Sequence, residues 1–257
     1  MTEPLLEVRR LVKLFGAVVA TAALDLAIMP GELHAVIGPN GAGKTTLIGQ
    51  LAGEVRPDAG HIYFAGRNIT ALSVPRRAAL GLARSFQSTS IFPGFSTLEN
   101  VALAIQAHAG HSFRFWRPAR SLTHIRHAAV EVLKNVGLAE RVVVPAARLS
   151  HGEQRQLEIA MALAATPKLL LLDEPTAGMG LEESAQMVAL LYSLRGQYTI
   201  LLVEHDMDMV FALADRITVL VDGRAIATGT SEAIRANAEV RRAYLGEDDS
   251  EVGRAQR

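Results

Sequence analysis

Gly38-Pro39-Asn40-Gly41-Ala42-Gly43-Lys44-Thr45, followed by Thr46, is the stretch of sequence that decides the fold of this chain. It matches the phosphate-binding pattern G-x-x-x-x-G-K-[ST] at every constrained position. The apolar run His34 to Ile37 before it predicts a buried parallel strand, and Thr45 to Leu51 predicts a helix. The glycines therefore fall at a strand-to-helix turn, which is the context that the motif requires, and the chain is predicted to bind a nucleoside triphosphate.

The residue types of this loop suit phosphate chemistry. Glycines let backbone N–H groups curl around phosphates without Cβ clashes, and the helix N-terminus adds partial positive charge. In this pattern Lys44 neutralises the β and γ oxygens, and Thr45 holds Mg²⁺. An ordinary glycine-rich turn is the alternative, and it becomes weaker with each further motif in the chain.

Composition limits the kinds of protein that this chain can be. It has 257 residues, of which 49% are hydrophobic and 20% charged, so a sizeable core is expected. Lys and Arg total 26, as do Asp and Glu, so the chain has no global basic field that would favour binding to nucleic acid. A nucleic-acid partner is therefore not expected. The absence of cysteine excludes disulfides, thiol catalysis and Cys-based metal sites. No run of about 18 apolar residues and no apolar signal core occur, so neither a membrane span nor standard export is expected.

The pattern along the chain predicts an α/β fold with an antiparallel N-terminal part and a mostly helical insert. Helical periodicity runs from Leu98 to about Val136, interrupted between Gly110 and Ser121, and returns from Leu157 to Ala165. Asp222-Gly223 is a tight-hairpin signal leading into Ala225 to Ala227. The expected strands are 6–15, 18–28, 33–37, 62–64, 169–172, 200–203 and 217–221.

A second motif, Leu169-Leu170-Leu171-Leu172-Asp173-Glu174, is an apolar strand that ends in two carboxylates. Ligands of parallel α/β sheets bind just beyond the carboxyl ends of strands. Asp173 can bind Mg²⁺ directly or through water, and Glu174 can orient or deprotonate the water that attacks the γ-phosphate. A strand followed by an acidic helix cap is the structural alternative, but the order of the two motifs favours a triphosphatase.

A third motif, Leu149-Ser150-His151-Gly152-Glu153-Gln154, has the S-x-x-E spacing of a capping box between Ser150 and Glu153. It lies about twenty residues before the acidic strand, where it resembles the signature motif of ATP-binding cassette (ABC) ATPases. The resemblance covers about residues 5 to 245. His151 stands where the usual signature has its first glycine.

The resemblance to ABC ATPases implies a fold: a P-loop NTPase nucleotide-binding domain with an N-terminal antiparallel β-subdomain, a RecA-like core and an inserted α-helical subdomain. It implies one domain over 5–245, with the insert at roughly 88–165, and a flexible tail at 246–257. ATP and Mg²⁺ are the implied cofactors. Head-to-tail pairing of two cassettes would set the signature residues Ser150, His151, Gly152 and Glu153 against ATP bound to the partner. Gly180 stands where the commoner Ser-Ala-Leu-Asp segment has its aspartate, so the usual contact of that aspartate is not implied.

The resemblance also implies roles in the nucleotide site for three single residues. Phe15 resembles the aromatic residue that stacks on adenine, Gln87 resembles the glutamine that binds Mg²⁺ or the attacking water, and His205 resembles the switch histidine that contacts the γ-phosphate and positions Glu174. Taken alone, Phe15 could be a core aromatic, Gln87 a loop residue and His205 a polar helix start. The residues expected to bind ATP are Phe15, Gly38, Pro39, Asn40, Gly41, Ala42, Gly43, Lys44, Thr45 and Thr46, with Thr45, Gln87 and Asp173 at the metal and Glu174 and His205 in catalysis.

Within the ABC family, the chain looks like the larger ATPase subunit of branched-chain amino-acid uptake systems. The similar segments are 83–87, 92–101, the long insert near 106–124, and 242–246. This implies an importer subunit on the cytoplasmic face of the cell membrane that couples ATP hydrolysis to uptake of hydrophobic amino acids, related amides or urea. Its partners would be integral membrane permeases, a second ATPase subunit that is either a copy or a paralogue, and indirectly a solute-binding protein. An exporter of lipid or lipopolysaccharide, and a soluble ABC ATPase acting on ribosomes or DNA, are the alternatives.

Two aromatic segments of the helical insert are less specific. Phe113-Arg114-Phe115-Trp116-Arg117-Pro118 interleaves aromatic and basic residues, and it could meet a permease, lipid headgroups or RNA, or pack on the helical lobe. Residues 87–95 are the better candidate for permease coupling, although Phe92 and Phe95 could instead fill the local core.

Overall fold

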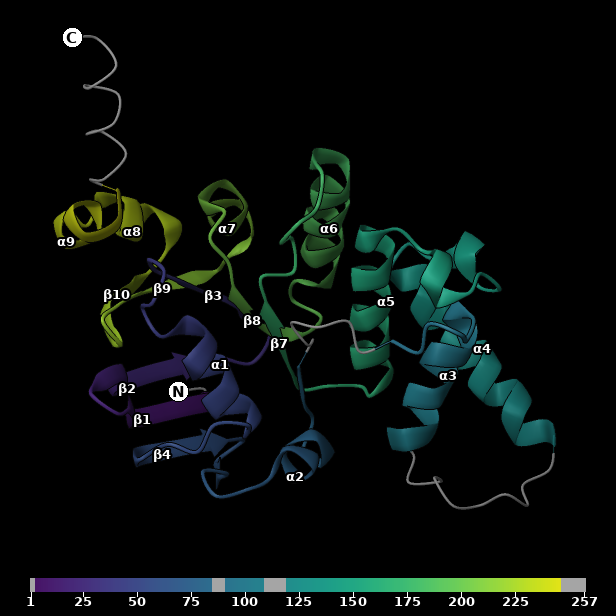
Figure 1. Ribbon diagram of the computed structural model, residues 1–257, viewed down its shortest axis with the longest axis horizontal. Coiled ribbons are helices and arrows are strands. Elements are labelled where there is room, and N and C mark those ends of the chain that lie inside the picture. Colours follow the sequence, from purple (N-terminus) through teal and green to yellow (C-terminus); the bar gives the residue numbers. More distant parts are fainter. Residues whose placement is uncertain (1–2, 85–90, 109–118, 246–257) are drawn as a thin grey trace, which may run out of the picture. The chain divides into compact units, whose positions relative to one another are not determined.

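The computed structural model describes residues 3–84, 91–108 and 119–245 of the chain. They form two compact units (Figure 1). The first unit joins Met1–Arg77 to Arg195–Arg257, and the second is Ala78–Leu194.

An antiparallel sheet opens the first unit, as predicted. Its strand order is β2-β1-β4-β5. Leu6 and Val8 of β1 and Leu24 and Ile28 of β2 are buried, so these strands turn one face to the core. The strands are β1 Leu6–Phe15, β2 Val18–Ile28, β4 Ala59–Phe64 and β5 Arg67–Asn68.

A parallel group of strands carries the phosphate loop. β3, Leu33–Ile37, lies between β8, Thr199–Val203, and β9, Arg216–Val221, and pairs with both in parallel. Every residue of β3 and β8 is buried, as expected of a parallel strand covered on both faces. β10, Arg224–Gly229, pairs antiparallel with β9.

The predicted hairpin at Asp222-Gly223 is confirmed. Both residues have positive φ, 48° and 75°. This is the geometry of the tight turn that fits the twist of a two-stranded hairpin, and Asp-Gly adopts it readily.

Short helices flank these strands. Asp206 caps α7 by accepting from Met209 N at 3.0 Å, and Thr230 caps α8 by accepting from Ala233 N at 3.4 Å. In Figure 1 strand β3 lies between α1 on one side and α7 and α8 on the other. The helices of this part of the chain are α1 Lys44–Ala52, α2 Val74–Ala79, α7 Met207–Leu213, α8 Ser231–Ala236 and α9 Ala238–Val240, followed by a π-helical turn over Arg241–Leu245.

A chain of polar side chains, buried except at the exposed Thr228, links β3 to β9 and β10. Glu32 Oε1 lies 2.7 Å from His34 Nδ1, and His34 Nε2 lies 2.8 Å from Thr218 Oγ1. Thr218 Oγ1 is in turn 2.8 Å from Thr228 Oγ1. His34 is completely buried, so these hydrogen bonds offset the cost of removing its ring nitrogens from water.

Arg77 supports the carboxyl end of α1 from inside the first unit. Its side chain is only 1% exposed. The guanidinium donates to four backbone carbonyl oxygens, those of Gln50 at 2.6 Å, Leu51 at 2.7 Å, Thr70 at 2.9 Å and Leu72 at 3.0 Å. Two of these carbonyls belong to the last turn of α1, where helix geometry leaves C=O groups without an intrahelical donor.

We therefore expect Arg77→Met to lower the free energy of unfolding by about 3–5 kcal/mol, because several buried carbonyl oxygens lose their donor at once. Denaturant titration followed by circular dichroism measures the change. Arg76→Met is the matched control, since Arg76 is exposed in the same helix and should shift the value by less than about 0.5 kcal/mol. Equal stability of the two variants would contradict this role for Arg77.

In its described residues the second unit combines two strands with four α-helices. β6, Leu82–Arg84, and β7, Leu169–Asp173, pair in parallel. The helices are α3 Thr97–His108, α4 Ala119–Asn135, α5 His151–Ala164 and α6 Leu181–Leu194, with short 3₁₀ turns at Ala139–Arg141 and Ala146–Arg148. Helices α3, α4 and α5 pack on one another (Figure 1). The helical pattern predicted on both sides of 110–121 is confirmed by α3 and α4, whereas β6 and α6 were not predicted.

Within the described part of the chain, no helix is both long and apolar enough to cross a bilayer.

Candidate functional site

The phosphate loop connects β3 to α1 in the first unit. Gly41 and Gly43 have positive φ, 83° and 97°. A Cβ atom on Gly43 would lie 2.0 Å from the Ala20 carbonyl oxygen, and one on Gly38 would lie 2.1 Å from that of Leu220. The loop is thus held against β2 and β9 at positions where only glycine fits.

The amino end of α1 opens onto this loop. Its N-cap is Gly43, and within the described residues no side chain caps it, so the first-turn N–H groups are available to a ligand. Lys44 has only 7% of its surface exposed. Its Nζ donates to Gly38 O at 2.7 Å and to Pro39 O at 3.0 Å. Thr45 is exposed at the helix start. Amide donors, an ammonium group and a hydroxyl therefore gather where a triphosphate with its Mg²⁺ would need them.

Phe15 ends β1 with half of its surface exposed, 52%. The Lys13 ammonium lies 5.3 Å from the centre of its ring. The alternative that Phe15 is a core aromatic is therefore wrong, and one face of the ring can stack on a planar ligand.

His205 follows β8, and its side chain is 62% exposed beside the buried Glu204. The His205 Nδ1 atom lies 3.6 Å from Glu204 Oε2, and the same carboxylate oxygen accepts from the His205 backbone N–H at 3.1 Å. Helix α7 begins two residues later, at Met207. Glu204 thus holds the His205 backbone while the ring faces solvent.

The acidic pair lies at the end of β7 in the second unit. Asp173 has 1% of its side chain exposed, and its Oδ2 lies 3.3 Å from Arg84 Nη2, at the end of β6. The Arg84 guanidinium therefore lies beside Asp173, and a carboxylate oxygen is a ligand type that Mg²⁺ prefers. Glu174 follows with φ 48°, an uncommon left-handed backbone for a residue with a side chain. Such strained positions cluster at functional sites.

The oxygen donors at the site are of the kinds that hold Mg²⁺ together with a nucleotide. Among the described residues, no group of three or more His, Cys, Asp or Glu side chains is arranged to hold a metal ion. Mg²⁺ in nucleotide sites is held by one or two protein oxygens together with phosphate oxygens. Thr45 and Asp173 match that donor chemistry, whereas Gln87 lies outside the described residues.

The signature segment starts helix α5 as the sequence predicts. Ser150 is the N-cap, and its Oγ accepts from Glu153 N at 3.2 Å while its own N–H donates to Glu153 Oε2 at 2.9 Å. This reciprocal pair is a capping box. Arg141 Nε fixes the other Glu153 oxygen at 2.6 Å. His151 is exposed, and its Cε1 would lie 3.7 Å from a Cβ on Gly178.

Two further residues belong to the candidate site, although they were not predicted from the sequence. One is Arg84, which contacts Asp173, and the other is Glu183 of α6, which accepts hydrogen bonds from Ser150 and Gly152. Their sequence separations, 89 and 31 to 33 residues, explain why no local pattern shows these contacts. Phe92 and Phe95 stack with ring centres 5.7 Å apart and are 50% and 44% exposed, so the core alternative for them is wrong. The aromatic segment 113–118 lies outside the described residues.

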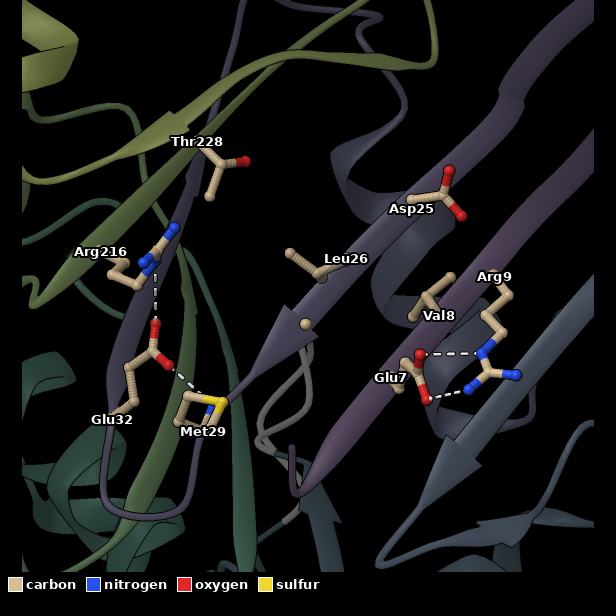
Figure 2. A pocket seen from close by; sticks show the side chains of 10 residues that line it. Glu7, Val8, Arg9, Asp25, Leu26, Met29, Glu32, Arg216 and Thr228 are labelled. Carbon is tan, nitrogen blue, oxygen red and sulfur yellow. Dashed lines mark hydrogen bonds and ion pairs between the residues drawn. The ribbon is translucent and has the colours of Figure 1, made fainter. Parts of the chain in front are cut away.

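A different pocket of the first unit has a volume of about 520 Å³ and is shown in Figure 2. It is lined by strands β1, β2, β9 and β10 and by the turn before β3, not by the phosphate loop. Its charged groups are already engaged: Arg9 binds Glu7 at 2.8 Å, and Glu32 Oε2 accepts from Met29 N at 2.7 Å. The phosphate loop is therefore the better anion site of this unit.

These features define the class of protein. An ATP-binding cassette has three such features: a phosphate loop after a buried parallel strand, an apolar strand that ends in an acidic pair, here Asp173-Glu174, and a capped helix that begins with Leu-Ser-x-Gly. A family model described as "ABC transporter" matches residues 21–177, and one described as "Branched-chain amino acid ATP-binding cassette transporter" matches residues 226–250. The chain therefore belongs to the ABC transporter family of ATP-binding proteins, and it is an ABC ATPase.

Its similarity to individual members extends over the whole chain. It is 38% identical to the high-affinity branched-chain amino acid transport ATP-binding protein BraF of Pseudomonas aeruginosa, covering 96% of this chain and 100% of that protein. Identity to LivG of Escherichia coli K12, which bears the same description, is also 38% with the same coverage. It is 34% identical to the ribose import protein RbsA 1 of Streptomyces coelicolor, but spans only 48% of that protein.

Solved structures confirm the predicted fold class. The ADP conformation of MJ1267, an ATP-binding cassette of an ABC transporter, superposes with a TM-score of 0.82 at 26% identity and covers 95% of this chain and 100% of that one. A nucleotide-free ATP-binding cassette gives 0.80 at 26% identity, covering 94% and 98%. The chain thus has the cassette fold, with an antiparallel subdomain and a parallel core.

Proposed function

We propose that this chain powers an importer of branched-chain or similar hydrophobic amino acids. The observation that carries the proposal is the match of residues 226–250 to the branched-chain family model. This segment lies outside the nucleotide motifs that all cassettes share, so it separates one branch of the family from the others. The full-length similarity to BraF and LivG supports the same branch.

The assembly that we propose has two permease subunits and two cassettes on the cytoplasmic face of the membrane, with a solute-binding protein delivering the cargo. The second cassette is a copy of this chain or a paralogue. In this assembly residues 5–245 act as one ATPase domain with its helical insert at roughly 88–165. The tail predicted at 246–257 lies outside the described residues.

Separate residues bind the phosphates, hold the metal ion and activate the attacking water in the proposed reaction. Lys44 and the amide groups of the loop bind the β- and γ-phosphates, while Thr45 and Asp173 hold Mg²⁺, which neutralises phosphate charge when bound. Glu174 orients the attacking water and accepts its proton, and His205 contacts the γ-phosphate. The amino end of α5, at Ser150, binds the γ-phosphate carried by the partner cassette.

Pairing of the cassettes links this chemistry to transport. Since the γ-phosphate bridges two cassettes, ATP binding closes the pair and hydrolysis releases it. The permeases follow this cycle of closure and opening.

We expect the Phe15 ring to contribute to the affinity for ATP. Phe15→Ala should weaken ATP binding about 5- to 150-fold, because stacking of one base on an aromatic ring contributes about 1–3 kcal/mol. Phe15→Trp, which keeps an aromatic face, should restore the affinity. Calorimetric titration with ATP measures both. Unchanged affinity in Phe15→Ala would remove Phe15 from the site, and failure of Trp to rescue would show that stacking is not its role.

Affinity purification of the tagged chain from its native membranes, followed by mass spectrometry, tests the proposed assembly. Recovery of two multispanning permeases with a second cassette is the expected result. Recovery of ribosomal or DNA-repair proteins without permeases would overturn the transporter assignment while leaving the ATPase intact.

A further inference from the structure

Glu183, in the first turn of α6, lies on the amino end of the signature helix. One of its carboxylate oxygens, Oε1, accepts from the Ser150 hydroxyl at 2.7 Å and from the Gly152 backbone N–H at 3.1 Å. Both donors belong to the start of α5, where helix geometry leaves N–H groups without an intrahelical acceptor. A carboxylate of the same chain thus satisfies the anion-binding groups of the signature motif.

The packing of the glutamate stem makes this contact specific. A Cβ atom on Gly152 would lie 3.0 Å from each of Cβ, Cγ and Cδ of Glu183. Because real Cβ atoms rarely come that close to their neighbours, the glycine at 152 is what lets the Glu183 side chain lie flat along the helix start. Gly152 therefore makes room for the Glu183 side chain, in addition to any contact that it makes with nucleotide.

The contact also stabilises the charged form of Glu183. The Ser150 hydroxyl, then the amide groups of Gly152 and Gly180, hold the pKa of the Glu183 carboxyl below its usual range. At neutral pH the group is an anion, and an anion at a helix N-terminus is favourable. The same donors cannot serve this carboxylate and a phosphate together, because each N–H or O–H donates to one strong acceptor and the two anions repel.

We propose that Glu183 is an internal competitor of ATP at the signature helix: its carboxylate holds the Ser150 hydroxyl and the Gly152 N–H until the γ-phosphate on the partner cassette displaces it. This inference rests on the proposed function, in which the start of α5 receives that phosphate. Displacement sets a threshold on closure, since each cassette must release a carboxylate to gain a phosphate. Glu183 is thus a regulatory residue of the dimer and not a catalytic one.

Nucleotide-driven pairing of the cassettes tests the proposal. The full chain would carry Glu174→Gln to suppress hydrolysis and would be studied with the cassette that co-purifies with it, whether a copy or a paralogue. Glu183→Gln and Glu183→Ala are compared by sedimentation velocity across a range of protein concentrations at saturating Mg-ATP. We expect the dissociation constant of the pair to fall about 3- to 30-fold, more in Ala than in Gln, because Gln keeps an acceptor but loses the charge.

Glu182→Gln is the matched control. Glu182 precedes Glu183 in the same helical turn and is exposed, so this variant makes the same change in net charge and should leave pairing within about twofold of the parent. ATP affinity of the unpaired chain is measured in parallel and should not change in any of the three variants. Pairing that is unchanged or weaker in both Glu183 variants would overturn the proposal.

Ser150→Phe separates this inference from the function on which it rests. If this variant binds ATP but no longer pairs, the signature helix does receive the partner's nucleotide, and the Glu183 series alone decides the competitor role. If Ser150→Phe pairs like the parent, the proposed phosphate contact fails, and the competitor role fails with it.

Discussion

Replacing Glu174 with Gln is expected to trap an ATP-bound pair of cassettes and to slow phosphate release at least about a hundredfold. Glu174 directly follows the buried strand β7 and has a left-handed backbone, with φ 48°, which marks a position held by its surroundings. Gln keeps the size and hydrogen-bonding capacity of the side chain but cannot accept the proton of the attacking water. Binding should therefore persist while the chemical step is lost.

Two measurements check this prediction. Size-exclusion chromatography with Mg-ATP should show the variant as a pair, and a phosphate-release assay should show the lost turnover. Glu182→Gln is again a suitable control, as an exposed carboxylate of the same unit that should keep the parent's rate. A Glu174→Gln chain that stays monomeric at saturating ATP, or that hydrolyses ATP at the parent rate, contradicts the role given to Glu174.

Lys44→Ala should have the largest effect on nucleotide binding. The Lys44 ammonium is buried within the loop, where it donates to the carbonyl oxygens of Gly38 and Pro39 at 2.7 and 3.0 Å. It is therefore already positioned where the loop would wrap a phosphate. Hydrogen bonds to charged groups contribute about 1.5–3 kcal/mol, so ATP affinity should fall about 10- to 150-fold and hydrolysis should fall with it.

Calorimetric titration with ATP measures this loss directly. Lys134→Ala is the control, since Lys134 forms only a surface ion pair with Glu131, 2.7 Å away, and such pairs contribute little. Thermal melting of the nucleotide-free proteins shows whether Lys44→Ala still folds. An Ala variant that folds and binds ATP as the parent does would remove Lys44 from the nucleotide site.

Local features of the fold could be read from the sequence because local chemistry determines them. The apolar strand before Gly38, the Asp222-Gly223 turn and the Ser150 capping box each depend on residues a few positions apart. In each case the structure has the element that the pattern predicts. The match of residues 21–177 to the ABC transporter family model confirms the class that those motifs predict.

Long-range features could not be read in the same way. Strand β6 has only three residues, Leu82–Arg84, and exists because it pairs with β7, more than 80 positions away. The burial of Arg77 and its bonds to the end of α1 likewise depend on how distant segments fold together. No periodicity distinguishes Glu183 from its exposed neighbour Glu182, because only the structure shows which carboxylate meets Ser150.

Departures from the usual family pattern have specific surroundings in this chain. His151 replaces a glycine of the signature and lies next to the Gly178 loop, while Gly180 accepts through its carbonyl from Ser184 N at 2.9 Å at the start of α6. Glu183 lies three residues after Gly180, in the first turn of that helix. The helical turn that follows the segment without the usual aspartate therefore supplies a carboxylate to Ser150.

Uptake by the reconstituted complex tests the central claim most directly. The complex that co-purifies with this chain would be placed in proteoliposomes with its solute-binding protein, and accumulation of radiolabelled leucine would be followed with and without ATP. We predict ATP-dependent accumulation of leucine that disappears when this chain carries Lys44→Ala. ATP-driven accumulation of ribose without leucine, or leucine uptake that is unaffected by Lys44→Ala, would contradict the account.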